Sequence, residues 1–136
     1  YALLKAKIDA GATRAITQFV FDTDVVLRFA DRAYREGIRV PIVPGIMPPT
    51  NFKGVVRMAQ RSGATVPLWL VRKFEGLDDD LETRKLIAAT VVAEQVEKLR
   101  RHGFDSFHFY TLNQADLTYA ICHLLGVRPQ TPAQAA

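Results

Sequence analysis

The chain has 136 residues, 49% of them hydrophobic, a size and composition that suit one domain. It contains no apolar run of 18 residues, which argues against a membrane span. The formal net charge of +4 comes from scattered Lys and Arg residues rather than from one basic face, so no nucleic-acid partner is indicated. The single cysteine, Cys122, excludes an internal disulfide and favours a cytoplasmic location.

The chain begins with Tyr1 rather than methionine. The segment that follows is too short and too soon charged for a signal peptide. We therefore expect this sequence to be part of a longer protein.

The first elements predicted are a helix, a strand and a second helix. An apolar stripe over 4–12 predicts a short helix that Gly11 ends. Residues 14–21 are typical of a buried parallel strand. Thr23 or Asp24 is expected to cap the next helix, which Gly37 ends.

The middle of the chain predicts a second strand and two further helices. The strand is expected over 38–43, followed by a stiff loop at 44–49. Asn51 caps a helix that runs to about Gln60. Pro67 could open a helix or interrupt a strand, and we favour the helix.

The last third predicts a long helix, a strand and a final helix. Asp78-Asp79-Asp80 precedes the long helix, which Gly103 ends, and these acids suit a helix start better than a metal site. A strand is expected over 106–112. Asn113 should cap the final helix, which ends at Gly126.

This alternation predicts an α/β protein in which parallel strands alternate with helical crossovers. A closed (β/α)8 TIM barrel takes roughly 250 residues, so a chain of this length would supply only a portion of one. We expect one unit over 1–127 and a flexible tail over 128–136.

Ligands of parallel α/β proteins gather at the carboxyl ends of the strands. This rule selects residues 18–22, 44–46 and 110–114. In the last strand, alternation puts Phe107 and Phe109 beneath the helices and turns His108 and Tyr110 inward.

Gln18 is the sharpest binding candidate, because a primary amide can pair with the edge of a pterin or nicotinamide. The alternative is a buried amide satisfied by the backbone. Tyr110 could stack on a flat ring or could be rim packing. Lys7 could reach a cofactor phosphate or could be solvated. His108 suits an interior imidazole better than a catalyst.

Other candidates are weaker. The three histidines lack metal-ligand spacing, so no metal site is predicted. Cys122 lies in an apolar helical pattern that favours core packing. Trp69 and Phe74 could form a lid, although packing beside the long helix is the stronger interpretation.

Several segments, in order along nearly the whole chain, resemble the methylenetetrahydrofolate reductase family. They include 7–12 (KIDAGA), 16–22 (ITQFVFD), 43–46 (VPGI), 76–80 (GLDDD), 82–84 (ETR), 108–113 (HFYTLN) and 119–122 (YAIC). The resemblance implies the C-terminal portion of a flavin-binding (β/α)8 barrel. It also implies an oxidoreductase of one-carbon metabolism that reduces methylenetetrahydrofolate to methyltetrahydrofolate with FAD and NADH or NADPH.

The resemblance implies roles for particular residues. Gln18 would contact folate and, in turn, nicotinamide at one shared site. Lys7, Ala6 and Leu3 would lie on the flavin-contacting helix. The remaining substrate-binding positions would be Tyr110, Gln114 and Gly54.

The sequence also departs from the family pattern. Gly54 stands where some members have glutamine, Met58 where an aromatic platform lies, and Gln114 where arginine often binds substrate. Leu3 and Ala6 are apolar where other members carry polar residues. The catalytic glutamate and the aspartate near the flavin belong to earlier strands, so this chain alone is expected to be inactive. Its partners would be the N-terminal half of the barrel and further copies in a homo-oligomer.

Two alternatives stay open. One is another flavin barrel, such as a proline-dehydrogenase-like oxidase. The other is a non-catalytic half-barrel that serves as an assembly module.

Overall fold

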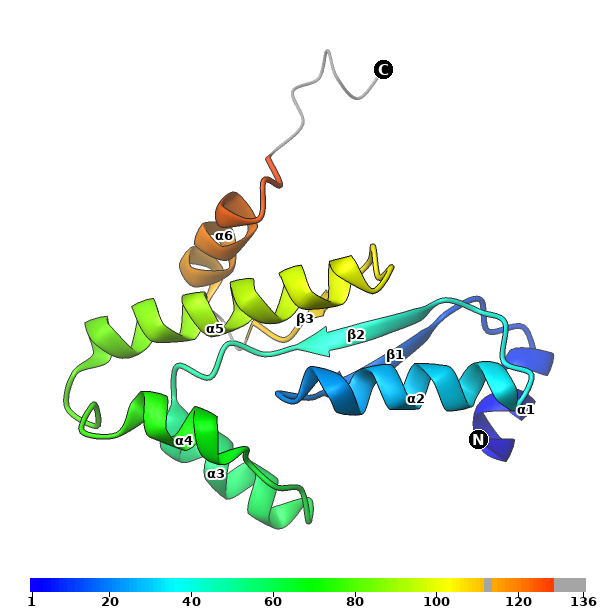
Figure 1. Ribbon diagram of the computed structural model, residues 1–136, viewed down its shortest axis with the longest axis horizontal. Coiled ribbons are helices and arrows are strands. Elements are labelled where there is room, and N and C mark those ends of the chain that lie inside the picture. Colours follow the sequence, from blue (N-terminus) through cyan, green and yellow to red (C-terminus); the bar gives the residue numbers. More distant parts are fainter. Residues whose placement is uncertain (112–113, 129–136) are drawn as a thin grey trace.

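The computed structural model describes residues 1–111 and 114–128 and contains six helices and three strands in that part of the chain (Figure 1). The helices are α1 (Ala2–Asp9), α2 (Thr23–Arg35), α3 (Phe52–Arg61), α4 (Leu68–Phe74), α5 (Leu81–Arg101) and α6 (Ala115–Leu124). The strands are β1 (Ala15–Phe19), β2 (Ile42–Ile46) and β3 (His108–Phe109). The alternation of parallel strands with helices is confirmed. It is compatible with part of a TIM barrel, and the three strands described do not close one.

The three strands form one parallel sheet in the order β1-β2-β3. Ala15 of β1 pairs with Ile42 of β2, and Gly45 of β2 pairs with His108 of β3. Because all three strands are parallel, the loops that follow them lie at one edge of the sheet. That edge is where a parallel sheet is expected to bind ligands.

The predicted strand limits need correction. The second strand begins at Ile42 rather than at 38, because the Ile38 amide still donates to the Ala33 carbonyl at the end of α2 (3.0 Å). Residues 44–46, predicted as loop, form the end of β2. Pro44 is tolerated there because pairing with β3 begins only at Gly45.

The outer strands are also shorter than predicted. The first is Ala15–Phe19 instead of 14–21, and it is not buried on both faces, since the Ile16 side chain is 51% exposed. The last is His108–Phe109 instead of 106–112. Residue 112 lies outside the described residues, as does Asn113, the predicted cap of the final helix.

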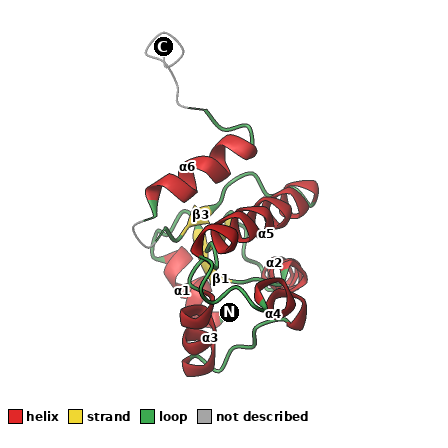
Figure 2. Ribbon diagram, turned by 90° about the vertical axis from the view of Figure 1, so that its left-hand side faces the viewer, coloured by secondary structure: helices red, strands yellow, loops and turns green. Residues whose placement is uncertain are grey.

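Two apolar clusters hold the helices to the sheet. The first joins Ile46 to α2, α5 and α6, and Phe107 and Phe109 pack against it, as alternation predicts. The second lies between the carboxyl end of β1 and helices α3, α4 and α5, with Leu70 and Ala88 fully buried. Both views show α6 lying next to α5 (Figures 1 and 2).

Side-chain caps fix the helix starts next to the sheet edge. The cap of α2 is Asp22, which accepts from the Asp24 amide (2.9 Å), so the prediction of Thr23 or Asp24 is wrong by one or two positions. Asn51 caps α3 through the Gly54 amide (3.2 Å), as predicted. Pro67 directly precedes α4, which confirms the helix over the strand.

The third carboxylate of the Asp78-Asp79-Asp80 run caps α5. Asp80 accepts from the Thr83 hydroxyl (2.6 Å) and from the Thr83 amide (3.0 Å). These two hydrogen bonds hold the pKa of the Asp80 carboxyl below its ordinary value. The acidic run therefore acts as a helix start, as predicted.

Asp80→Ala is expected to lower the Tm by a few degrees near neutral pH, because it removes this cap. Since the pKa is depressed in the folded state, the stabilisation is present above the unfolded pKa and is lost as pH falls through the folded pKa. The difference in Tm between the two proteins should therefore shrink below about pH 4. Thermal unfolding followed by circular dichroism measures it, with Asp79→Ala as the control. A difference in Tm that stays constant down to pH 2 would contradict this assignment.

No helix in the described part of the chain is long and apolar enough to cross a membrane.

Candidate functional site

The carboxyl edge of the sheet carries a hollow that we call the Gln18 hollow, with a volume of about 590 Å³. It lies where β1 leads into α2 and is walled on the other side by α3 and the loop after it. Its lining residues are Gln18, Phe19, Val20, Phe21, Asp22, Val25, Met58, Ala59, Ser62, Gly63, Ala64, Thr65 and Pro67.

A smaller hollow of about 90 Å³, the Gln114 hollow, lies between the loop after β2, α3 and the start of α6. Its lining residues are Met47, Pro48, Asn51, Gly54, Val55, Met58, Thr111 and Gln114. Met58 lines both hollows, so they adjoin along α3.

Three of the four predicted substrate-binding residues therefore lie along one continuous edge. Gly54 and Gln114 face the same hollow although 60 positions separate them, and Gln18 lines the neighbouring one. Gln18 is exposed, and its Oε1 accepts a long hydrogen bond from the adjacent Phe19 amide (3.4 Å). It is therefore not the buried, backbone-satisfied amide of the alternative interpretation.

Tyr110 lies beside this edge and does not line either hollow. Its hydroxyl donates to the Thr17 carbonyl (3.2 Å), and its ring meets the ring of Phe19 edge-on at 6.0 Å. The hydroxyl proton is thereby used, so a ligand could only donate to this oxygen. The rings of His108 and Tyr110 meet edge-on at 4.7 Å, so the two side chains share one face, as alternation predicts. His108 is exposed, so it is not the interior imidazole that was expected.

Two sets of contacts hold the start of α3, which forms one wall of the hollows. A Cβ atom on Gly54 would lie 2.7 Å from Nδ2 of Asn51, so the glycine leaves room for the Asn51 cap. Arg84 of α5 donates to the carbonyls of Thr50 (3.1 Å) and Leu77 (2.7 Å), and also to that of Asp78. The guanidinium thus ties the loop before α3 to the loop before α5.

The predicted cofactor residues lie elsewhere. Leu3, Ala6 and Lys7 belong to α1, which buries none of its residues and leads into the amino end of β1 (Figure 1). Tyr1 at its start stacks on Phe29 of α2, with ring centroids 5.6 Å apart. The structure does not bring these three residues together with Gln18.

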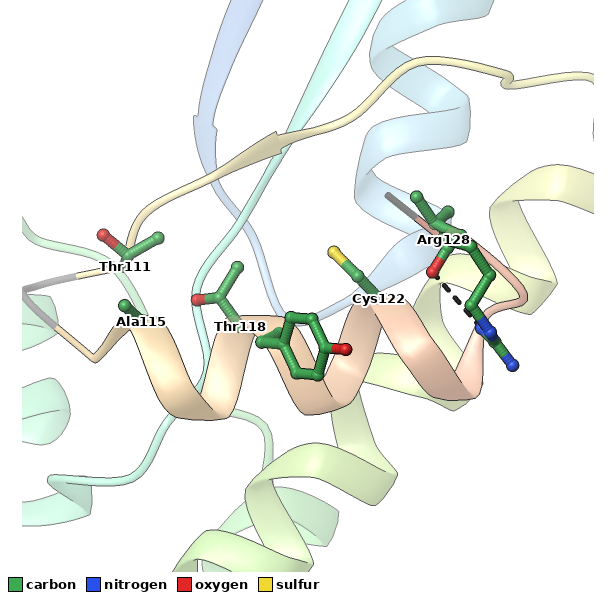
Figure 3. Close-up of a pocket in the computed structure, with 7 residues that line it drawn as sticks. Thr111, Ala115, Thr118, Cys122 and Arg128 are labelled. Carbon is green, nitrogen blue, oxygen red and sulfur yellow. Dashed lines mark hydrogen bonds between the residues drawn. The ribbon is translucent and has the colours of Figure 1, made fainter. Parts of the chain in front are cut away.

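A separate hollow of about 690 Å³ lies over the outer face of α6 (Figure 3). Thr111, Thr118, Tyr119 and Cys122 line it, and none of the predicted binding residues does. Cys122 is half-buried at this surface, so the prediction of core packing is wrong. The helix turns Leu117 and Ile121 toward the core instead.

The predicted aromatic lid is divided between two environments. Phe74 is buried and stacks on Phe52 with ring centroids 4.7 Å apart, which is core packing. Trp69 is 44% exposed and lines a hollow between the start of α2, α4 and α5, together with Lys73 and Lys98. The two residues do not form one lid.

A lysine and an aspartate form an ion pair at the margin of the site. Lys98 of α5 donates to Asp24 in the first turn of α2 (2.9 Å), and this bond holds the pKa of the Asp24 carboxyl below its ordinary value. Among residues 1–111 and 114–128, no three His, Cys, Asp or Glu side chains gather as a metal site would require.

Three residues that support the edge did not stand out in the sequence: Thr17, Arg84 and Gln95. Gln95 is buried and donates to the Val20 carbonyl just beyond β1. Each has a hydrogen-bond partner far along the chain: Thr17 bonds to Gly45, Arg84 to Thr50 and Gln95 to Val20, at separations of 28, 34 and 75 positions. A polar residue in the apolar stripe of the long helix was the one local signal, and it applies only to Gln95.

These features define a parallel α/β protein with its candidate binding site at the carboxyl edge of the sheet. Residues 1–126 match the family model described as methylenetetrahydrofolate reductase. The chain belongs to the methylenetetrahydrofolate reductase family.

Curated relatives agree with this assignment. The chain is 54% identical over 126 residues to 5,10-methylenetetrahydrofolate reductase of Escherichia coli, a match that covers 93% of this chain and 43% of that protein. The protein of the same name from Pectobacterium carotovorum is 56% identical, with 93% and 42% covered. Methylenetetrahydrofolate reductase (NADH) 1 of Arabidopsis thaliana is 40% identical, with 93% and 21% covered. The chain thus spans less than half the length of these relatives.

Proposed function

We propose that this chain forms part of an oxidoreductase that reduces methylenetetrahydrofolate to methyltetrahydrofolate with electrons from NADH or NADPH. The observation that carries the proposal is the continuous edge formed by Gln18, Met58, Gly54 and Gln114. Such an edge offers amide groups above an apolar wall, which suits a flat heterocycle with polar edges. The family and the names of the relatives supply the reaction.

Gln18 has the central role in this proposal. Its amide offers two donors and one acceptor, so it can pair with a pterin edge or with a carboxamide. One site could then accept folate and nicotinamide in turn. Met58 would supply apolar contact to whichever ring is bound.

Gln114 would face the more polar part of the substrate. Its amide is neutral, so it can donate hydrogen bonds to a carboxylate but adds no charge attraction. The Lys85 ammonium lies 3.9 Å from the carboxylate of nearby Asp116. This carboxylate partly neutralises the cation, so Lys85 adds little attraction for an anionic tail. Modest affinity for an anionic tail is therefore part of the proposal.

The residues of α1 fit FAD in their chemistry. Positions 3, 6 and 7 share one helix face, and Leu3 is 70% exposed. Lys7 would hold a phosphate through its ammonium group, while Leu3 and Ala6 would give van der Waals contact. When bound, FAD supplies the hydride-transfer chemistry that no amino-acid side chain has.

The test is reconstitution. This chain is co-expressed with the part of the Escherichia coli reductase that it does not cover, and we call the product the reconstituted reductase. We expect a yellow protein with a flavin spectrum that oxidises NADH or NADPH when methylenetetrahydrofolate is present. The E. coli part expressed alone is the control.

Other outcomes point to the alternatives. A yellow protein that does not oxidise NADH or NADPH in the presence of methylenetetrahydrofolate would contradict the proposed reaction. A stable complex that stays colourless after FAD addition would contradict the reductase proposal and favour an assembly module.

A further inference from the structure

The end of β1 contains an irregularity at the residue next to Gln18. Ile16 pairs with Val43, and the next pair is Phe19 with Gly45. β1 therefore advances by three residues where β2 advances by two, which is the arrangement of a β-bulge. A bulge bends its strand and changes the direction of the side chains within it. The residues in this bulge are Thr17 and Gln18.

The Thr17 side chain takes the place of the missing ladder contact. Its hydroxyl accepts from the Gly45 amide (2.9 Å) and donates to the Gln18 carbonyl (2.8 Å). In a regular parallel ladder, the Gly45 N–H would bond to a backbone carbonyl of β1. The hydroxyl thus satisfies β2 and at the same time fixes the peptide group that follows Gln18.

The peptide group before Gln18 is held by Tyr110, which directly follows β3. With Gly45 bonded to the hydroxyl, the Thr17 carbonyl accepts from the Tyr110 hydroxyl instead (3.2 Å). Both carbonyls that flank Gln18 are therefore held by side chains. Within residues 1–111 and 114–128, the Gln18 side chain has only the long hydrogen bond with its neighbour, so its direction depends on this backbone.

We propose that Thr17 is a positioning residue for Gln18: its hydroxyl stabilises the bulge that directs the Gln18 amide into the Gln18 hollow. The identity of the ring that the amide meets rests on the proposed function. The hydroxyl acts through its hydrogen bonds to the Gly45 amide and the Gln18 carbonyl.

The test compares Thr17→Val, which keeps the shape and removes the hydroxyl, with Thr17→Ser, which keeps the hydroxyl. In the reconstituted reductase, Thr17→Val should lower kcat/KM for methylenetetrahydrofolate about tenfold, and Thr17→Ser should stay within about twofold. The FAD content should not change. In a Gln18→Ala background, Thr17→Val should cause no further loss, because residues that act as one unit are not additive.

Two results would overturn the proposal. One is a Thr17→Val substitution that lowers kcat/KM by the same factor in the Gln18→Ala background as in the unmodified protein. The other is a Thr17→Ser variant with kcat/KM as low as that of Thr17→Val.

Hydrogen exchange of the Gly45 amide, measured by NMR, separates this inference from the reaction. Thr17→Val should speed the exchange about tenfold, and Thr17→Ser should leave it slow. If the unmodified reconstituted protein shows no reductase activity, the proposed function fails. The exchange measurement alone then tests the positioning role of Thr17. Equal exchange rates in all three forms would then refute the positioning role.

Discussion

Replacing Gly45 with alanine is expected to lower the free energy of unfolding by about 3 kcal/mol, near the upper end of ordinary overpacking effects. The added Cβ atom would lie 2.6 Å from the Thr17 carbonyl oxygen, 2.8 Å from Cε2 of Tyr110 and 3.0 Å from the Gln18 carbonyl carbon. The tyrosine ring can shift, but the two backbone atoms belong to the neighbouring strand. The overlap of the added Cβ atom with these backbone atoms can therefore be removed only if β1 and β2 move apart.

Chemical denaturation of the chain, followed by circular dichroism, measures this loss. Gly54→Ala is the matched control, because the three atoms nearest its Cβ belong to the Asn51 side chain. That side chain can rotate at the cost of its cap on α3, and the gain in helix propensity from alanine offsets part of this cost. We expect Gly54→Ala to cost much less than Gly45→Ala. Equal midpoints for Gly45→Ala and the unmodified chain would show that the strands are not packed as closely as described.

The second large effect is expected for Gln18→Glu in the reconstituted reductase. A carboxylate can accept hydrogen bonds but cannot donate them, and it adds a negative charge. The folate and nicotinamide half-reactions should therefore slow by different factors, on the order of tenfold to a hundredfold for the more sensitive one. FAD should remain bound, since its proposed contacts lie on α1.

Stopped-flow absorbance of the flavin follows each half-reaction separately. Gln60→Glu is the control, because it makes the same chemical change at an exposed position of α3. Complete loss of FAD, with both half-reactions abolished alike, would argue against a ring-binding role for Gln18.

The helices could be predicted because their signals are local. Asn51, Asp80 and Pro67 mark helix starts within a few residues of the groups that they serve. The face of the last strand was also predictable, since Phe107 and Phe109 follow simple alternation. The order of strands and helices also predicted parallel strands whose carboxyl ends meet at one edge, and the sheet has that arrangement.

The strand limits and the support of the site could not be predicted in the same way. Ile38 looks like the start of a strand, but its amide closes the end of α2. The contacts of Thr17 with Gly45 and Tyr110 join residues that are 28 and 93 positions apart. They depend on the register of two strand pairs, and a single sequence does not state that register.

The extra residue in β1 has a consequence for how this segment can change in length. Deleting either Thr17 or Gln18 would leave one residue opposite Pro44 and restore an even ladder, with Phe19 still paired with Gly45. Val20 and Phe21 would then keep their places in the two apolar clusters. The deletion would instead remove either the hydroxyl that bonds to Gly45 or the amide that lines the Gln18 hollow. The length of this segment is therefore constrained by the proposed site rather than by the core.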